Sequence, residues 1–201
     1  MHFASDNSGP VPPQILEALS LANQGYAMGY GADAEMAQVT ARIRETFEAP
    51  EAAVYLVATG TAANVLSLSV LAQPWQVMFC TGPAHINQDE CNGPEFFSGG
   101  AKLKTVCAAD KMTAQDLRAA LEGEENRGVH GPQRGPVSLS QVTEFGTVYS
   151  LDELNALGAV AQSYGLPVHL DGARFANALV SLGCSPAEMT WKAGVEALSF
   201  G

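Results

Sequence analysis

The sequence has 201 residues, 47% of them hydrophobic, so it can bury a large core without disulfides or a metal. Its formal net charge is −11, with ten Lys and Arg against 21 Asp and Glu, which argues against nucleic-acid and anionic-membrane partners. The four cysteines form no C-x-x-C pair, so we predict no metal site. No segment approaches the ~18 apolar residues of a membrane helix, and no secretory signal begins the chain, so we expect a cytoplasmic protein.

Short β-rich runs alternate with segments of helical periodicity, a pattern typical of a parallel sheet covered by helices on both faces. The sequence therefore predicts an α/β fold. The expected strands are residues 53–57, 77–80, 103–106, 137–139, 168–170 and 195–198. The expected helices are residues 14–23, 34–47, 62–71, 113–121, 151–164 and 173–182. The segment 123–136, rich in Gly, Pro and charged residues, is expected to be a surface loop.

Residues 59–64, TGTAAN, follow an expected strand and open an expected helix. Free backbone amides and the positive end of the helix dipole would meet there, so the segment could bind a phosphate. Gly60 allows close approach of the backbone, and Thr61 can add a hydroxyl donor. The alternative is an ordinary turn capped by Thr. Because the segment lacks the lysine of a P-loop and residues 29–34 lack the third glycine of a dinucleotide fingerprint, nucleotide binding is disfavoured.

Residues 169–174, HLDGAR, place Asp171 at the carboxyl end of an expected strand, where open α/β sheets bind ligands. A carboxylate at that position can keep a pyridinium nitrogen protonated, and the ring then accepts electrons from a developing carbanion. Arg174 lies three residues later and has a guanidinium suited to a substrate carboxylate. The alternative is a helix-capping Asp with a surface ion pair.

His85 follows another expected strand at the same end of the sheet and could lie against a cofactor ring or transfer protons. Asp89 and Glu90 come shortly after it. Two acids near a histidine can also indicate a metal site, but this spacing matches no strong metal motif. A purely structural histidine is the alternative.

These segments occur together in an order and spacing that resemble the low-specificity L-threonine aldolases. The resemblance extends nearly from end to end of the chain. The segments that carry it are residues 4–7 (ASDN), 30–31 (YG), 59–64, 84–85 (AH), 89–90 (DE), 94–97 (PEFF), 143–149 (TEFGTVY), 169–174 and 199–201 (SFG).

The resemblance implies the fold-type I architecture of pyridoxal 5'-phosphate (PLP) enzymes and an aldehyde-lyase activity. Such an enzyme cleaves L-threonine, L-allo-threonine and related β-hydroxy-α-amino acids to glycine and an aldehyde. Its active sites are shared across a subunit interface, so the resemblance implies a homodimer or homotetramer with a small-molecule amino-acid substrate.

The resemblance also implies roles for individual residues in cofactor binding. Gly60 and Thr61 become phosphate ligands, Asp171 the partner of the pyridine nitrogen, and His85 the residue stacked on the ring. Arg174 also borders the cofactor. The roles of Gly60, Thr61, Asp171 and His85 agree with those derived from the residues themselves.

For the substrate, the resemblance implies that Ser5 and Arg174 hold the carboxylate and that Tyr30 borders the site. His130, in the loop of residues 128–130, is expected to contact the substrate hydroxyl. Either His85 or His130 could transfer the proton of that hydroxyl, and the sequence leaves this choice open.

The family attaches its cofactor to a lysine just beyond the Ser-Phe-Gly of residues 199–201, and no lysine of this sequence sits at that position. We therefore expect residues 1–201 to be an N-terminal arm plus the PLP-binding large domain, with the lysine and a small C-terminal domain outside this sequence. Alternatives are another fold-type I PLP lyase, such as a phenylserine aldolase or β-eliminating lyase, or a noncatalytic truncated relative.

Overall fold

The computed structural model describes residues 8–201, which form two compact units. The first extends to Arg42 and the second is Ile43–Gly201. The first unit contains helix α1 (Pro13–Ala22) and most of α2 (Ala34–Thr46). Pro13 begins α1 at a position where a helix does not need the missing N–H group. Within residues 8–201, no helix has the length and apolar character needed to cross a membrane.

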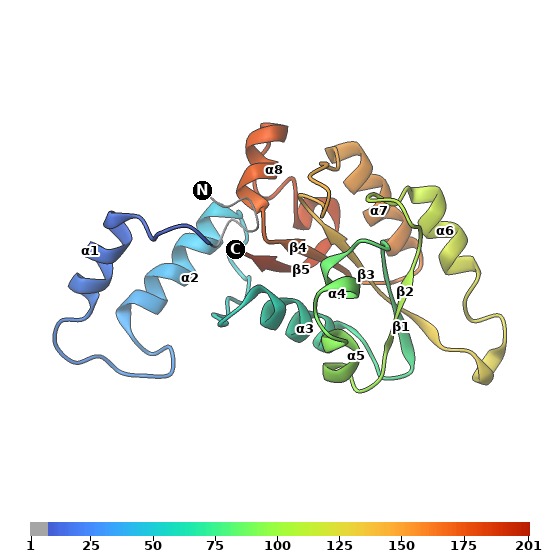
Figure 1. Ribbon diagram of the computed structural model, residues 1–201, viewed down its shortest axis with the longest axis horizontal. Coiled ribbons are helices and arrows are strands. Elements are labelled where there is room, and N and C mark those ends of the chain that lie inside the picture. The colour runs from blue at the N-terminus through green and yellow to red at the C-terminus, as the bar shows by residue number, and fades with distance from the viewer. Residues whose placement is uncertain (1–7) are drawn as a thin grey trace. The chain divides into compact units, whose positions relative to one another are not determined.

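The second unit is built on a five-stranded sheet, all of whose strands are parallel, in the order β2-β1-β3-β4-β5 (Figure 1). This confirms the predicted α/β class. Parallel strands need crossover connections, and the helical segments between the strands provide them. The strands are β1 (Gln76–Cys80), β2 (Lys102–Thr105), β3 (Gln133–Ser140), β4 (Val168–Gly172) and β5 (Val195–Phe200).

The six helices predicted from periodicity all form, with ends shifted by at most two residues. Thr113 and Asp116 form a capping box, which fixes the start of α6. In the second unit the predicted helices are α3 (Gly60–Leu71), α6 (Ala114–Glu122), α7 (Leu151–Ser163) and α8 (Phe175–Leu182). Short helices that the sequence did not indicate are α4 (His85–Gln88), α5 (Gly93–Phe97), η2 (Gly128–His130) and η3 (Trp191–Ala193).

The strand predicted at residues 53–57 was wrong, because this segment forms no strand in the structure. Most of its apolar side chains are exposed, with Tyr55 at 83% and Leu56 at 72%. An apolar run favours a strand only where a neighbouring strand completes its backbone hydrogen bonds, and no strand among residues 8–201 does so here.

The surface loop predicted at residues 123–136 ends earlier than expected, because β3 begins at Gln133. The backbone N–H of Gln133 donates to the Trp75 carbonyl at 3.0 Å. Gly135 permits this pairing, since a Cβ atom there would lie 2.6 Å from the carbonyl oxygen of Val77. Backbone pairing with β1 therefore overrides the loop-like composition.

The two faces of the sheet pack against different helices. Val168 and Leu170 of β4 belong to the larger apolar core, together with residues of α6, α7 and α8. On the opposite face, Met78 and Cys80 of β1 pack with Leu68 of α3 in a smaller cluster. Alternate residues of a strand point to opposite faces, so the sequence of each strand determines which side chains meet which helices.

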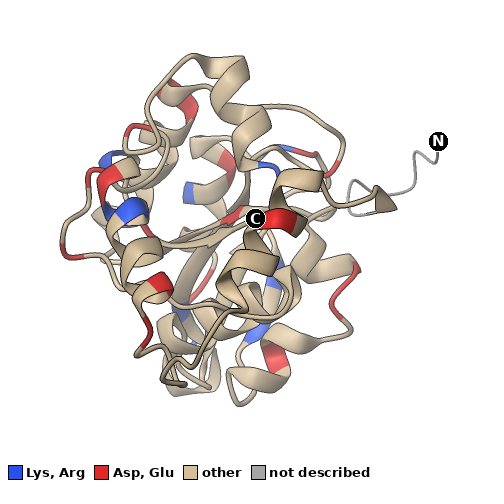
Figure 2. Ribbon diagram, turned by 90° about the vertical axis from the view of Figure 1, so that its left-hand side faces the viewer, with Lys and Arg blue, Asp and Glu red and all other residues tan. Residues whose placement is uncertain are grey.

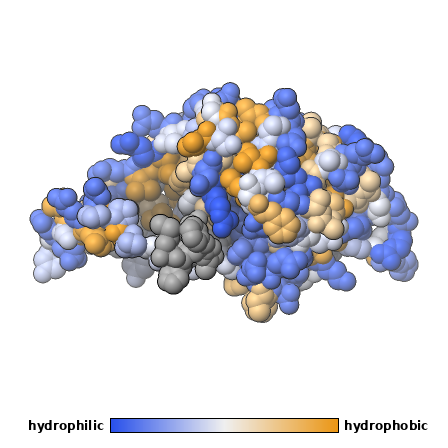
Figure 3. Space-filling model, turned by 45° about the horizontal axis from the view of Figure 1, so that its top comes forward, coloured by the Kyte–Doolittle hydropathy of each residue, from blue (hydrophilic) through white to orange (hydrophobic). Residues whose placement is uncertain are grey.

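The surface carries far more acidic than basic side chains, as the net charge requires. Figure 2 shows Asp and Glu on many elements and Lys and Arg at separate places in that view. Exposed large hydrophobic side chains of the second unit include Phe96, Phe97, Phe145 and Val180. In the face drawn in Figure 3, hydrophobic areas are bordered by hydrophilic ones.

Candidate functional site

The face of the sheet opposite the larger core carries polar side chains near the carboxyl ends of β3, β4 and β5. Ser138 lies opposite His169 in the register of β3 and β4, and Ser140 lies opposite Asp171. Ser199 of β5 lies opposite Asp171 on the other side of β4. All five are buried or half-buried, so this polar group lies within the packed structure, at the edge where parallel sheets bind ligands.

Asp171 is the centre of this group and is only 7% exposed. Its Oδ2 accepts a hydrogen bond from Nδ2 of Asn64 at 2.8 Å, and its Oδ1 accepts one from the backbone N–H of Ala173 at 3.1 Å. Asn64 lies on α3, four residues after Gly60, which is about one helical turn. The hydrogen bond therefore fixes the N-terminal turn of α3 beside Asp171.

The N-terminus of α3 has the features of an anion-binding site. Thr59 is the N-cap, and its Oγ1 accepts a hydrogen bond from the N–H of Ala62 at 3.1 Å. The N–H groups of Gly60 and Thr61 belong to the set that every helix leaves without an intrahelical acceptor. The segment 59–64 thus opens a helix as predicted, although no strand precedes it.

An open cavity of about 410 Å³ borders this helix N-terminus. Thr59, Thr61, Glu90 and Phe96 are among the residues that line it. Its volume lies within the range of small-molecule sites. The cavity therefore lies beside the predicted phosphate site.

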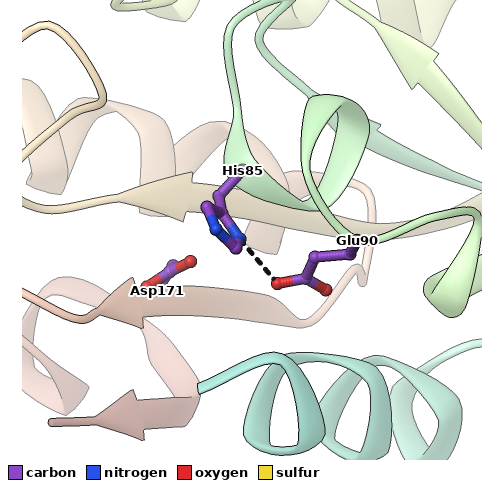
Figure 4. Close-up of side chains that lie close together, drawn as sticks. All are labelled: His85, Glu90 and Asp171. Carbon is purple, nitrogen blue, oxygen red and sulfur yellow. Dashed lines mark hydrogen bonds and ion pairs between the residues drawn. The ribbon is translucent and has the colours of Figure 1, made fainter. Parts of the chain in front are cut away.

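His85 approaches Asp171 from α4, as Figure 4 shows, and its side chain is 40% exposed. Its Nδ1 lies 2.9 Å from Oε1 of Glu90. Its backbone N–H donates to Oε1 of Glu144 at 3.0 Å, and the hydroxyl of Ser140 donates to the same oxygen at 3.1 Å. His85 is thus held through both its backbone and its ring.

The charges around His85 favour its protonated form. Partial burial acts to lower the pKa of His85, but the hydrogen bond and charge of Glu90, with the charges of Asp171 and Glu144, outweigh it and raise the pKa above 6.5. Burial raises the pKa of Glu90, although hydrogen bonds from Asn64 and His85 act in the opposite direction. The His85–Glu90 pair therefore tends to retain a proton.

His169 lies on the same side of β4 as Asp171 but is fully buried. Its Nδ1 lies 2.9 Å from the Ser138 hydroxyl and its Nε2 3.0 Å from the Ser199 hydroxyl. Burial lowers the pKa of His169 to about 4, although the charge of Asp171 acts in the opposite direction. A neutral imidazole has one donor and one acceptor nitrogen, so one serine hydroxyl donates to it and the other accepts.

His85, Glu90 and Asp171 each place one possible ligand atom within 4.8 Å of the others. The facing atoms of His85 and Glu90 are hydrogen-bonded to each other, and Asn64 bridges both carboxylates. We therefore interpret this group as a hydrogen-bonded network. That the protein has no metal site stays a prediction.

The roles predicted for Arg174, His130, Tyr30 and Ser5 are not tested by the contacts described above. Arg174 is exposed at the N-cap of α8, three residues after Asp171. His130 is exposed in η2, which precedes the amino end of β3, so within this chain it is on the far side from the carboxyl edge. Tyr30 is exposed in the first unit, and Ser5 lies outside the described residues. Their proposed contacts with substrate stay predictions.

Asn64, Glu144 and His169 were not identified from the sequence, and Glu90 was noted only as an acid near His85. Two signals could have found some of them. The alternation of a strand places His169 on the face of Asp171, and the spacing of a helix places Asn64 one turn after Gly60. Glu144 lies in a loop, where no periodicity indicates its direction.

Comparison with known proteins identifies the family of this chain. The model of the beta-eliminating lyase family matches residues 2–201. The chain belongs to this family. It is 43% identical over 201 residues to a low-specificity L-threonine aldolase of Pseudomonas sp. (strain NCIMB 10558), covering 99% of this chain and 57% of that protein. Over 184 residues it is 29% identical to the low-specificity L-threonine aldolase of Saccharomyces cerevisiae, covering 89% of this chain and 46% of that protein.

Solved structures confirm the predicted fold-type I architecture. The threonine aldolase of Leishmania major matches with a TM-score of 0.84 and 32% identity, over 90% of this chain and 53% of that one. A serine palmitoyltransferase of S. paucimobilis, solved with a bound PLP–myriocin aldimine, shares the fold at a TM-score of 0.55 and 18% identity, over 79% of this chain and 38% of that one. The chain thus spans little more than half the length of its most similar relatives.

Proposed function

We propose that this protein is a PLP-dependent aldolase that cleaves L-threonine, L-allo-threonine and related β-hydroxy-α-amino acids to glycine and an aldehyde. Membership of a PLP-dependent family and 43% identity to a low-specificity L-threonine aldolase support the proposal. The observation that carries it is the hydrogen bond between Asn64 and Asp171. It holds a helix N-terminus suited to a phosphate beside a buried carboxylate suited to a protonated ring nitrogen.

The residues present fit PLP in chemical type. Gly60 and Thr61 would bind the phosphate through N–H groups at the start of α3. Asp171 would hold the proton on the ring nitrogen, and His85 would lie against the ring. PLP, when bound, supplies a protonated ring that accepts the electron pair released when the bond between Cα and Cβ breaks. Asp171 stabilises that electron-accepting state because its charge is fixed in advance by two hydrogen bonds.

Substrate binding involves residues near the carboxyl edge and residues elsewhere in the assembled protein. Ser5 and Arg174 would orient the substrate carboxylate, Arg174 also bordering the cofactor, and Tyr30 would border the site. His130 would contact the substrate hydroxyl. Either His85 or His130 takes the proton from that hydroxyl, and the raised pKa of His85 suits a group that also returns protons.

The arrangement of the whole protein is part of this proposal. Residues 1–201 would supply an N-terminal arm and the PLP-binding large domain, and the cofactor-binding lysine and a small domain would follow. The active site would be completed between the subunits of a cytoplasmic homodimer or homotetramer. In such an assembly, residues that are exposed in one subunit, such as Tyr30 and His130, would contribute to the active site of the neighbouring subunit.

A β-eliminating lyase is the second candidate, favoured by the description of the matching family. The two activities differ in their products, because elimination from L-threonine yields a keto acid and ammonia, whereas aldol cleavage yields glycine and acetaldehyde. A preference for phenylserine over L-threonine would instead identify a phenylserine aldolase. If the protein catalysed neither aldol cleavage nor elimination, a noncatalytic relative would be supported.

The test is to incubate the holoenzyme with L-threonine and quantify glycine and acetaldehyde. We expect both in equal amounts, and Asp171→Asn to lower kcat by roughly 100-fold or more, the scale of losing one preorganised electrostatic partner. Asp152→Asn, an exposed acid in the first turn of α7, is the matched control and should keep wild-type activity. Near-normal turnover by Asp171→Asn would refute the assignment of Asp171.

A further inference from the structure

Glu90 is a buried acid next to an exposed one. Asp89 is the C-cap of α4 and is exposed, whereas Glu90 is 5% exposed and its side chain is fully buried. Cys91 and Asn92, which follow, both adopt positive φ angles of 51° and 58°. This turn separates α4 from α5 and directs Glu90 toward the interior, while its neighbour in sequence stays in solvent.

The carboxylate of Glu90 links the two residues that the proposed function needs most. Its Oε1 lies 2.9 Å from Nδ1 of His85 and accepts a hydrogen bond from Nδ2 of Asn64 at 2.8 Å. The same Nδ2 donates to Asp171 at 2.8 Å. A continuous path of hydrogen bonds therefore joins His85, Glu90, Asn64 and Asp171, which come from three separate segments of the chain.

This path determines which nitrogen of His85 faces the reactants. A carboxylate oxygen only accepts hydrogen bonds, so Nδ1 carries the hydrogen that bonds to Glu90. Nε2 is then the nitrogen left to give or take a proton. A carboxylate behind a catalytic imidazole generally fixes its tautomer and orientation in this way.

The network is costly for stability alone. A buried carboxylate loses several kcal/mol of hydration that only good pairing restores. Among the described residues, Oε2 of Glu90 and Oδ1 of Asn64 are buried without a hydrogen-bond partner. A well-packed apolar side chain would serve the fold at least as well, so the polar network is better explained by the site it supports.

Two further acids act on the His85–Glu90 pair, Asp171 on β4 and Glu144 after β3. We propose that Glu90 is a positioning residue that orients His85 through Nδ1 and, through Asn64, keeps the imidazole and the Asp171 carboxylate in a fixed relation. The inference rests on the proposed function, because it assigns Glu90 to the reaction performed beside His85.

The experiment is a double-mutant cycle on the holoenzyme with Glu90→Gln, His85→Phe and the double variant. Gln keeps an oxygen for His85 and Asn64 but removes the charge, so the fold should be retained. We expect Glu90→Gln to lower kcat by about 10- to 100-fold, the range for groups that orient a functional residue. In the His85→Phe background the same change should cost less than about 3-fold, because Glu90 acts through the imidazole.

A second measurement follows the ring of His85 by NMR as the pH is varied. Removing the charge of Glu90 should lower the pKa of His85, whereas the exposed control Asp89→Asn should leave both this pKa and kcat unchanged. The inference would be overturned if Glu90→Gln lowered kcat equally in the wild-type and His85→Phe backgrounds, or if it left the pKa of His85 unchanged. Cleavage of L-threonine by the wild type would still uphold the proposed function in that case. Failure of the wild-type holoenzyme to cleave any β-hydroxy amino acid would overturn both.

Discussion

The two faces of β3 and β4 differ in chemistry although they share the same backbone. Val168 and Leu170 of β4 point into an apolar core formed with α6, α7 and α8. His169 and Asp171, each one residue further along, point to the face that α3 covers, where they bond to serine hydroxyls and to Asn64.

The difference shows how one strand contributes both to the apolar core and to the candidate site. The apolar face gains free energy from burial of side chains that need no partners. The polar face gains little from burial and requires a partner for each donor and acceptor. A substitution on the first face should therefore change mainly stability, and one on the second should also change the response to pH.

The largest expected effect is on the apolar face. Leu170 is fully buried, so Leu170→Ala should lower the free energy of unfolding by about 2–5 kcal/mol through lost burial and a residual cavity. Urea unfolding measures this change. Leu56→Ala, the same substitution at a side chain that is 72% exposed, should change it by less than about 0.5 kcal/mol. Similar losses in both variants would contradict the assignment of the core.

The next effect is a loss of stability in acid that arises from His169 on the polar face. Folding lowers the pKa of His169 from 6.5 to about 4, so between these values the unfolded chain binds the additional proton. The free energy of unfolding should therefore fall as the pH drops through this window, by about 3 kcal/mol from this residue. His85, whose pKa is raised, acts in the opposite sense, because its contribution is lost as pH rises through its folded pKa.

Other groups also titrate in acid, so His169→Phe isolates this contribution. The variant should start from a lower stability, because the hydroxyls of Ser138 and Ser199 lose their partner. Its free energy of unfolding should nevertheless fall less steeply between pH 6.5 and pH 4 than that of the wild type. Parallel pH profiles would show that His169 is not held neutral by folding.

The smallest expected effect is the loss of one hydrogen bond. Ser138→Ala removes the hydroxyl beside Nδ1 of His169 and should cost about 1–2 kcal/mol, since a buried nitrogen loses its partner. Ser69→Ala is the control, because its hydroxyl bonds an exposed carbonyl of its own helix. Urea unfolding measures both variants. Equal free energies of unfolding would contradict the claim that the buried hydrogen bond of Ser138 stabilises the polar face.

Local patterns determined much of the fold. The helical periodicity of residues 151–164 and 173–182 predicted α7 and α8 closely, because an amphipathic period of 3.6 residues is a property of the segment itself. The apolar run at 53–57 predicted a strand that does not form, because strand formation is not a property of the segment alone. A strand exists only with a partner, and the partner is a property of the tertiary structure.

The site was determined in part by sequence and in part by packing. The sequence alone indicated Gly60, Thr61, His85 and Asp171 as candidates, because each opens a helix or follows a strand at a position where α/β proteins commonly bind ligands. Only the tertiary structure brought Asn64 and Glu90, 26 residues apart, into one hydrogen-bonded group with Asp171, which lies 107 residues from Asn64. Periodicity acts over a few residues, whereas hydrogen bonds between side chains depend on how distant segments pack.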